Sequence, residues 1–331
     1  MDKLSLAERI ANRARKRQAR EERAKRREFR ELRAKRNALA EAAQGQGTPF
    51  IDAQTNKPLF LGNLYRGASA FIILSGPSVL DLDLSLLRRR GIITIGVNNS
   101  PATFRPNIWT HVDPLLKFHD AIWKDPAILK FVNRNKLDHS IRIKKPDGRF
   151  LTITRKAENG QVEPVCARDM PGVIGDCRNA YFNPETWLSE PTINWGNSKR
   201  SWGKNKQPRI LNVMLAAVKL AYSLGFRIVY LLGCDFNMQE HRPYSFSEAK
   251  GATPIASNNE KYSLLCDYFS VLKPHFDAAG YRVFNCNPDS GLTIFPFVGY
   301  IEAIESATAH VPQDPLDTAG WYLKVDRVPA A

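Results

Sequence analysis

Residues 71–79, FIILSGPSV, and residues 227–236, RIVYLLGCDF, decide the fold class. Each stretch is a short apolar run, rich in β-branched residues, that ends abruptly in glycine and small polar residues. This pattern is typical of a buried parallel strand that runs out into a loop. Ligands of open α/β sheets bind at the carboxyl ends of the strands. The two stretches therefore predict a parallel sheet with a nucleotide-type site where their loops meet.

Outward from these stretches, apolar runs alternate with helical segments, which predicts an α/β fold with a Rossmann-like parallel sheet. We expect strands at 69–74, 92–97, 108–112, 227–232 and 282–285, and helices at about 82–90, 115–135, 210–224, 259–279 and 299–307. Residues 136–205 are rich in Gly, Pro, Asn and Trp and lack clean periodicity. We interpret them as an inserted lid or subdomain within a main domain of residues 69–310.

The first 43 residues form a basic arm. They hold 15 Lys and Arg against 7 Asp and Glu, a net of +8 out of the formal +15 of the chain. Because no Pro or Gly interrupts residues 4–43, we expect a long helix. It is either a solvated or loosely coiled-coil helix, or an arm that binds nucleic acid or another anionic surface. Residues 44–68 read as a linker and lead-in segment, and residues 311–331 as a C-terminal tail.

Composition excludes several classes of protein. No apolar run approaches the roughly 18 residues that cross a bilayer, and the N-terminus has no apolar segment of signal-peptide type. We therefore expect a cytoplasmic protein with no membrane span. The cysteines are odd in number, contain no C-x-x-C pair, and are interpreted as reduced structural thiols without a zinc site. They are Cys166, Cys177, Cys234, Cys266 and Cys286.

The loop after the first strand, residues 75–78, contains neither the G-x-G-x-x-G fingerprint nor a Walker lysine. Within it, Gly76 allows close approach of the backbone and Pro77 stiffens the turn. The Ser78 hydroxyl and the amides that follow can meet phosphate oxygens. A plain strand-to-helix turn explains the same residues equally well.

Polar residues also end the next two strands. Asn98 and Asp113 suit ribose or sugar hydroxyls, although each can also be a helix cap. The Asp81-Leu82-Asp83 run imitates a metal-binding DxD motif, and we interpret it as a cap of the helix after the glycine turn.

The order of these motifs resembles a known family. It comprises GPS at 76–78, the strand that ends at Asn98, the strand that ends before Pro114, LGFRIVYLLGCDF at 224–236, YSF at 244–246 and NCNPDSGL at 285–292. The series resembles the family 42 glycosyltransferases, the bacterial sialyltransferases of the Campylobacter type, over residues 69–300 without the insert. A more distant likeness is to MptE-like hydroxymethylpterin diphosphokinases. The resemblance implies a GT-A-like variant of the Rossmann-like fold and metal-independent transfer from a nucleotide sugar, with no cofactor besides this co-substrate.

Residue by residue, the resemblance implies a nucleotide-sugar site. It consists of Ser75, Gly76, Pro77, Ser78, Asn98 and Asp113, with Arg209 or Asn212 at the start of the next long helix. Ser75 and Asp113 stand where the family usually has Asn, and Asn237 stands where it has a second tyrosine. Tyr244 is expected to hydrogen-bond the departing phosphate.

The chain departs from the family at the general base. The family's histidine precedes the helix expected at 259, and residues 251–260 contain no histidine. His241, Glu260 or Asp235 is therefore the candidate base that accepts the proton of the acceptor hydroxyl.

Several functions remain open at this point. The charge of +15 and the basic arm favour a polyanionic acceptor, and a phage-encoded enzyme that glycosylates modified DNA bases in the host cytoplasm fits both halves of the chain. The alternatives are sialyltransferase-like transfer to cell-surface glycans and a non-catalytic module held to nucleic acid by its arm. A diphosphokinase is disfavoured because no carboxylate pair for Mg²⁺ lies beside the phosphate loop.

Overall fold

The computed structural model describes residues 20, 27, 31, 50–62, 64–144, 149–158, 160–176, 187–188, 212–247 and 252–311. Their core is one sheet of nine strands in the order β13-β12-β3-β4-β5-β6-β11-β1-β2. The first seven strands of this order are mutually parallel, and β1 and β2 add two antiparallel strands at one edge. This arrangement confirms the α/β class and the mostly parallel sheet.

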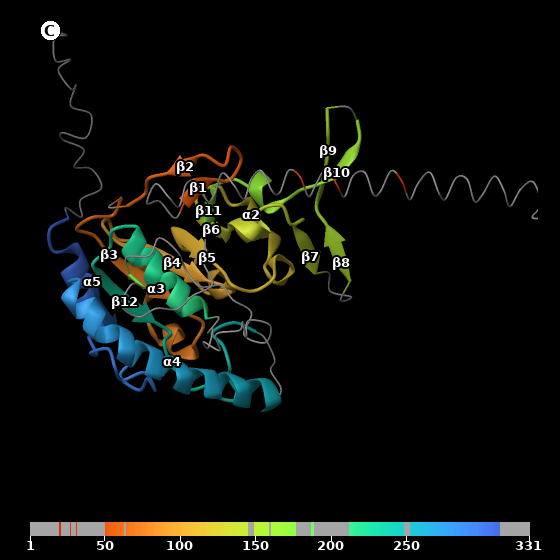
Figure 1. The fold of residues 1–331 in the computed structure, drawn as a ribbon. Helices are drawn as coiled ribbons and strands as arrows, with labels where there is room; N and C mark the ends of the chain where they lie inside the picture. The colour runs from red at the N-terminus through yellow and green to blue at the C-terminus, as the bar shows by residue number, and fades with distance from the viewer. Residues whose placement is uncertain are drawn as a thin grey trace, which may run out of the picture.

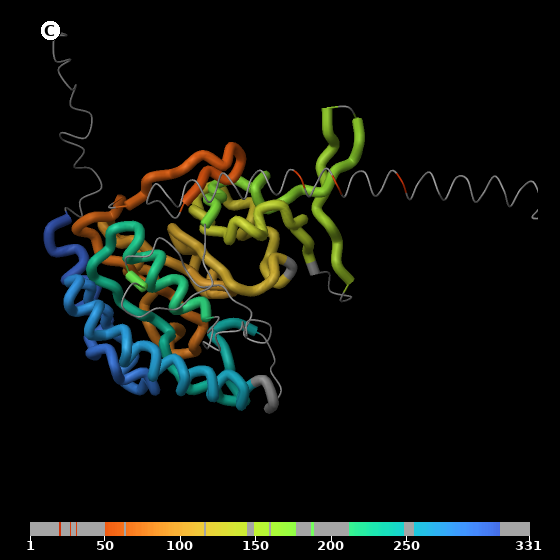
Figure 2. The backbone as a smooth tube through the Cα atoms, viewed as in Figure 1, coloured from red at the N-terminus to blue at the C-terminus, as the bar shows by residue number. Residues whose placement is uncertain are grey.

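The strands of the main sheet are β1 (Phe50–Asp52), β2 (Pro58–Leu59), β3 (Ser69–Ile73), β4 (Ile93–Val97), β5 (Ile108–Thr110), β6 (Leu129–Asn133), β11 (Val173–Asp176), β12 (Ile228–Leu232) and β13 (Arg282–Asn285). The α-helices of the described residues are α2 (Asp120–Lys124), α3 (Val213–Ser223), α4 (Ala252–Ala278) and α5 (Tyr300–Thr308). Figures 1 and 2 show their arrangement around the sheet.

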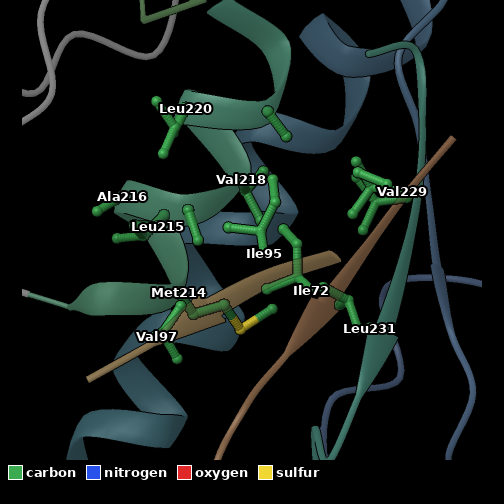
Figure 3. Packing of buried hydrophobic residues seen from close by; sticks show 14 of the residues in the cluster. Ile72, Ile95, Val97, Met214, Leu215, Ala216, Val218, Leu220, Val229 and Leu231 are labelled. Atoms are coloured by element: carbon green, nitrogen blue, oxygen red, sulfur yellow. The ribbon is translucent and has the colours of Figure 1, made fainter. Parts of the chain in front are cut away.

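Helices cover both faces of the sheet because each central strand is apolar on both sides. In β3, Ala70 and Ile72 belong to the cluster that includes α3 and α4, whereas Phe71 and Ile73 pack with Tyr230 and with α5. Figure 3 shows side chains of α3 lying against Ile72 of β3 and against strand β4. At about 25 cal/mol per Å² of buried apolar surface, this two-sided burial is the main stabilising term of the domain.

The chain reverses its direction of winding next to β3. From β3 it proceeds through β4, β5 and β6 toward one edge, and it then returns to place β12 and β13 on the other side of β3. The loops after β3 and β12 therefore leave the sheet side by side at a topological switch point, where ligands of such sheets bind.

Several sequence-based expectations are corrected. The helix expected at 115–135 is wrong: α2 covers five residues, and β6 follows it in the sheet. The helix expected at 82–90 is replaced by two 3-10 helices, η1 (Pro77–Asp81) and η2 (Leu84–Arg88). Helix α4 begins at Ala252, seven residues before the expected start.

The region expected to be an insert has two parts. Strand β11 joins the main sheet beside β6, so residues 173–176 belong to the core. Two antiparallel pairs precede it and project away from the sheet in Figure 1. They are β7 (Arg142–Lys144) with β8 (Phe150–Thr152), and β9 (Thr154–Lys156) with β10 (Val162–Pro164).

At the N-terminus, Arg20, Arg27 and Glu31 are helical, and Arg27 donates to Glu31 one turn later at 2.8 Å. The rest of residues 1–49 and residues 312–331 lie outside the described part of the chain, as does Cys177. The other four cysteines are free thiols. No helix among the described residues is long and apolar enough to cross a membrane.

Strand β6 carries a buried cation. Lys130 is 0% exposed, and its ammonium group donates to the carbonyl oxygens of Asp125 at 2.6 Å, Ile128 at 3.0 Å and Pro171 at 2.8 Å. Pro171 lies just before β11, so the lysine ties the two neighbouring strands together.

Candidate functional site

The turn after β3 is packed against the turn after β12. The Gly76 amide donates to the Gly233 carbonyl at 3.0 Å. A Cβ atom on Gly76 would overlap that carbonyl oxygen and would lie 2.6 Å from the Asp235 carboxyl carbon. The close backbone approach expected at Gly76 is therefore an approach to the neighbouring loop of the same chain.

Asp235 connects three loops. Its carboxylate accepts from the Ser78 amide at 3.1 Å and from the Ser78 hydroxyl, and Asn287 in the loop after β13 donates to it at 2.9 Å. Ser78, which we expected to meet phosphate oxygens, thus has its amide and hydroxyl bonded to a carboxylate. Since both oxygens of Asp235 accept hydrogen bonds, this residue positions the loops and is poorly suited to act as a base.

Asn98 joins the ends of β4 and β5. Its side-chain oxygen accepts from the Val112 amide at 3.2 Å, and its carbonyl accepts from the Trp109 indole at 2.8 Å. Its φ of 47° lies in the left-handed region, which asparagine adopts more readily than most residues. Asp113 at the end of the next strand accepts from Lys117 at 3.2 Å.

Asn212 is the N-cap of α3, and its side chain accepts from the amides of Met214 at 2.7 Å and Leu215 at 3.4 Å. A cap of this kind stabilises a helix by about 1 kcal/mol. Arg209, the alternative residue for this position, lies outside the described residues. Asp83, from the DxD-like run, caps η2 by accepting from the Ser85 amide at 3.0 Å, which confirms the interpretation of that motif as a cap.

The segment that carries Tyr244 is fastened to the loop after β3. The Ser245 amide donates to the Ser75 carbonyl at 2.9 Å, and the Ser245 hydroxyl lies 2.8 Å from the Thr103 hydroxyl. The Tyr244 ring stacks on Phe246 with centroids 5.1 Å apart. These contacts hold Tyr244 over the ends of the strands.

Helix α4 contributes three residues that the sequence analysis missed, namely Asn258, Lys261 and Tyr262. They are three and four positions apart, so they share one face of the helix. Tyr262 stacks on Phe236 at 4.9 Å, and burial raises its pKa to about 12. The Tyr262 hydroxyl therefore keeps its proton at neutral pH and can donate it to a ligand.

These elements enclose a cleft of about 260 Å³ at the carboxyl ends of β3, β4, β5 and β12. Nine of the residues that the sequence analysis selected line it: Ser75, Gly76, Pro77, Asn98, Asp113, Asn212, Asp235, Asn237 and Tyr244. Among the lining residues of the described chain, Lys261 is the single Lys or Arg. Phe236, with φ of 52°, is held in a strained conformation within the same wall.

The remaining two candidates for the base lie elsewhere. His241 lines a second cavity of about 400 Å³ beside the cleft, together with Ser78. Glu260 is exposed on α4 and lines neither cavity. Within the described ranges, no group of three or more His, Cys, Asp and Glu side chains is arranged to hold a metal ion.

No family model matches the chain, and no curated protein matches it. Solved structures that are similar to it are glycosyltransferases. The sialyltransferase CstII from Campylobacter jejuni, in complex with a substrate analogue, cytidine-5'-monophosphate, is 12% identical with a TM-score of 0.35, over 71% of this chain and 86% of that one. The same enzyme in complex with a trisaccharide acceptor and CMP is 13% identical with a TM-score of 0.35, over 71% and 87%.

The MAf glycosyltransferase from Magnetospirillum magneticum AMB-1 is 13% identical with a TM-score of 0.38. The alignment covers 77% of this chain and 37% of the MAf chain. Since superpositions this loose do not transfer the role of any residue, the function must be argued from the cleft itself.

Proposed function

We propose that the protein is a metal-independent glycosyltransferase. It binds a nucleotide sugar in the cleft between the loops after β3 and β12 and moves the sugar to an acceptor hydroxyl. The observation that carries this proposal is the position of the cleft at the switch point, with apolar, hydroxyl, amide and ammonium groups on its walls.

The nucleoside half of the donor fits the wall formed by β4, β5 and α3. Val112 supplies apolar surface for a base, whereas Val97 and Met214 line the cleft but are almost fully buried. Asn98 and Asp113, at the ends of two adjacent strands, supply an amide and a carboxylate for ribose hydroxyls.

The phosphate half fits the opposite wall. Lys261 supplies a cation, and Tyr244 and Tyr262 supply hydroxyl donors. Burial raises the pKa of Tyr262 to about 12, so that its hydroxyl stays protonated at neutral pH. When the acceptor oxygen forms its bond to the anomeric carbon, the bond from that carbon to the phosphate oxygen breaks and the nucleotide leaves with the electron pair. Donors placed in advance around that oxygen stabilise the developing charge without a metal ion.

The proton of the acceptor hydroxyl needs a base. Asp235 is engaged by Ser78 and Asn287, and Glu260 lines neither cavity, which leaves His241 as the best of the three candidates. The net charge of +15 supports a polyanionic acceptor, such as DNA with hydroxylated bases, and a saccharide is the alternative acceptor.

A thermal-shift panel tests donor binding. A nucleoside monophosphate or its sugar conjugate at a hundred times its Kd should stabilise the protein by about 2.7 kcal/mol, and ATP with Mg²⁺ should not. Lys261→Met should weaken the response, whereas Lys156→Met on β9, far from the cleft, is the control. A panel in which no nucleotide stabilises the protein would refute the proposal.

Turnover tests the chemistry. Tyr244→Phe should lower transfer by roughly two to three orders of magnitude, and His241→Ala by about 10² to 10⁴. The second candidate function is a non-catalytic nucleotide-binding module. Two observations support it: the Asp235 carboxylate is occupied by hydrogen bonds, and residues 251–260 lack the general-base histidine of the resembled family. Nucleotide binding without any sugar transfer or donor hydrolysis would establish the binding module instead.

A further inference from the structure

Two β-hairpins project from the domain near the wall of the cleft that Asp113 forms. They are the pairs β7–β8 and β9–β10, and strand β7 lies against η4 (Leu115–Lys117), which follows Asp113. Where the two pairs meet, Ile153 packs with the buried cluster of Trp109 and donates its amide to the Ile141 carbonyl at 3.0 Å. In Figure 1 the pairs extend to opposite sides of this junction. The core therefore holds the hairpins at their junction and leaves their strands largely exposed.

The alternation of side chains divides the hairpins into two faces. Residues 150, 152, 154 and 156 point to the side opposite Ile153, whose side chain packs on the core. Across the pairs, Arg142 lies opposite Thr152, and Val162 lies opposite Lys156. We call the side that carries these residues the outer face. Its exposed members are Arg142, Phe150, Thr154, Lys156, Val162 and Pro164.

The outer face carries cations that no carboxylate neutralises. Arg142 and Lys156 are exposed, and within the described part of the chain no ion pair engages either of them. Glu163 falls on the other face, where it lies opposite Arg155. Arg155 also pairs with Asp169 at 3.4 Å. The charge of Arg155 is therefore compensated, whereas the two cations of the outer face are available to an anionic partner.

Phe150 gives the outer face an exposed ring. This residue is 40% exposed, and the Arg142 guanidinium lies 5.6 Å from the centroid of its ring. An arginine that stacks on a ring keeps the N–H donors at its edge for phosphate oxygens. Thr154 adds an exposed hydroxyl, and Val162, at 70% exposed, adds apolar surface. Donors beside a ring and apolar surface suit a sugar-phosphate chain that carries bases better than they suit a small anion.

We propose that the outer face of the two hairpins binds nucleic acid through its phosphate backbone. Residues 140–165 contain six Lys and Arg against three Asp and Glu, and the major groove of B-DNA admits a two-stranded β-ribbon. The turns of the hairpins are KPDG at 145–148 and AENGQ at 157–161, whose polar residues disfavour insertion into a membrane. This surface belongs to the domain and is separate from residues 1–43. It requires no sugar transfer in the cleft.

Fluorescence anisotropy of a labelled duplex DNA of mixed sequence, titrated with the full chain at several salt concentrations, tests the proposal. Arg142→Met and Lys156→Met should each weaken binding by roughly tenfold at about 0.1 M salt. Each should also lower the slope of log K against log salt by about 0.9, as the loss of one phosphate contact does. Lys156→Arg, which keeps the charge, should bind as the wild type does.

Arg155→Met is the matched control, because it removes the same charge from the same strand on the opposite face, and it should leave the salt slope unchanged. Residues 1–43 are present in every variant, so differences between the variants belong to the hairpins. All of the substituted positions are exposed, and each variant should melt at the temperature of the wild type.

Three results would overturn the proposal. Wild-type affinity and slope in both Arg142→Met and Lys156→Met would place the DNA contacts elsewhere on the chain. Equal losses in Arg155→Met would show a response to net charge without a binding face. Sedimentation with phosphatidylserine vesicles that is lost in Arg142→Met and Lys156→Met, while DNA affinity stays unchanged, would assign the outer face to a membrane surface.

Discussion

Gly76 lies in the turn after β3 and packs against the turn after β12, so this position has no room for a side chain. An added methyl group overlaps the Gly233 carbonyl and the Asp235 carboxylate, and neither is the free end of a flexible side chain. Gly76→Ala should lower the free energy of unfolding by about 1 to 3 kcal/mol, as overpacking generally does.

Denaturant unfolding measures this loss, with Gly62→Ala as the control, because nothing lies within 4 Å of a Cβ added at Gly62. Equal stability of the two variants would contradict the close contact of the loops. If Gly76→Ala remains folded, any loss of nucleotide affinity can be assigned to movement of the loop.

Tyr262 gives the molecule a pH dependence in the alkaline range. An unfolded tyrosine loses its proton near pH 10, whereas burial raises the pKa of Tyr262 to about 12 in the native state. Between these values the native state holds more protons than the unfolded state, so its stability falls as the pH rises. Below pH 10 the proton of Tyr262 adds no pH dependence to the free energy of unfolding. Between pH 10 and pH 12 that free energy should fall by about 2 to 3 kcal/mol.

Urea unfolding of wild type and Tyr262→Phe at several pH values checks this prediction. The stability of the wild type should decrease more steeply than that of the variant above pH 10. Parallel decreases would mean that the Tyr262 hydroxyl is hydrated and titrates normally.

At the scale of elements, Lys130 stabilises the pairing of β6 with β11. Lys130→Met would leave three carbonyl oxygens without their donor in a position that is 0% exposed. Unpaired buried groups of this kind cost about 1 to 3 kcal/mol, so we expect a loss of at least about 2 kcal/mol.

Lys124→Met is the matched control, since Lys124 forms an exposed pair with Asp120 one turn away and such pairs contribute about 0 to 1 kcal/mol. Hydrogen exchange should also quicken in β11 of the Lys130 variant and not in β12. Hydrogen exchange that quickens equally in all strands of the variant would contradict a local role of Lys130 in the pairing of β6 with β11.

The sequence predicted those strands that are continuously apolar. β3, β4, β12 and β13 were found within one residue at each end, because β-branched runs followed by glycine or asparagine are distinctive. β6 was mistaken for helix because Lys130 interrupts its apolar run, and the three carbonyls that accept from this lysine come together only in the folded chain.

The sequence predicted the site residues that follow strands and missed those that lie on helix α4. Asn98 and Asp113 follow apolar runs and line the cleft, although their binding roles stay predictions. Glu260 was chosen on the expectation that α4 starts at 259. With the actual start at Ala252, the face toward the cleft carries Asn258, Lys261 and Tyr262, and the spacing of these three residues could have revealed that face.

At the scale of the whole molecule, the basic arm and the domain should be separable. Deletion of residues 1–43 removes a net charge of +8 out of +15 and leaves every strand of the described sheet in place. Stability and nucleotide binding should therefore be unchanged, whereas affinity for duplex DNA should fall and its dependence on salt should become shallower.

Fluorescence anisotropy at several salt concentrations measures both quantities on the full and shortened chains. A shortened chain that binds DNA with the same affinity and slope would show that the remaining +7 of the domain carries the interaction.

The antiparallel edge of the sheet sets where the described chain enters the domain. The chain enters the sheet at Phe50 in β1, and β11, β6, β5 and β4 separate that strand from β3. At roughly 4.8 Å per strand, the point of entry is about 24 Å from the switch point. Under the proposed function, a polymer bound by residues 1–43 would be held on the same molecule as the cleft, which raises the effective concentration of any sugar that the polymer bears. Deletion of residues 1–43 should then raise KM for a polymer-borne acceptor and leave kcat unchanged.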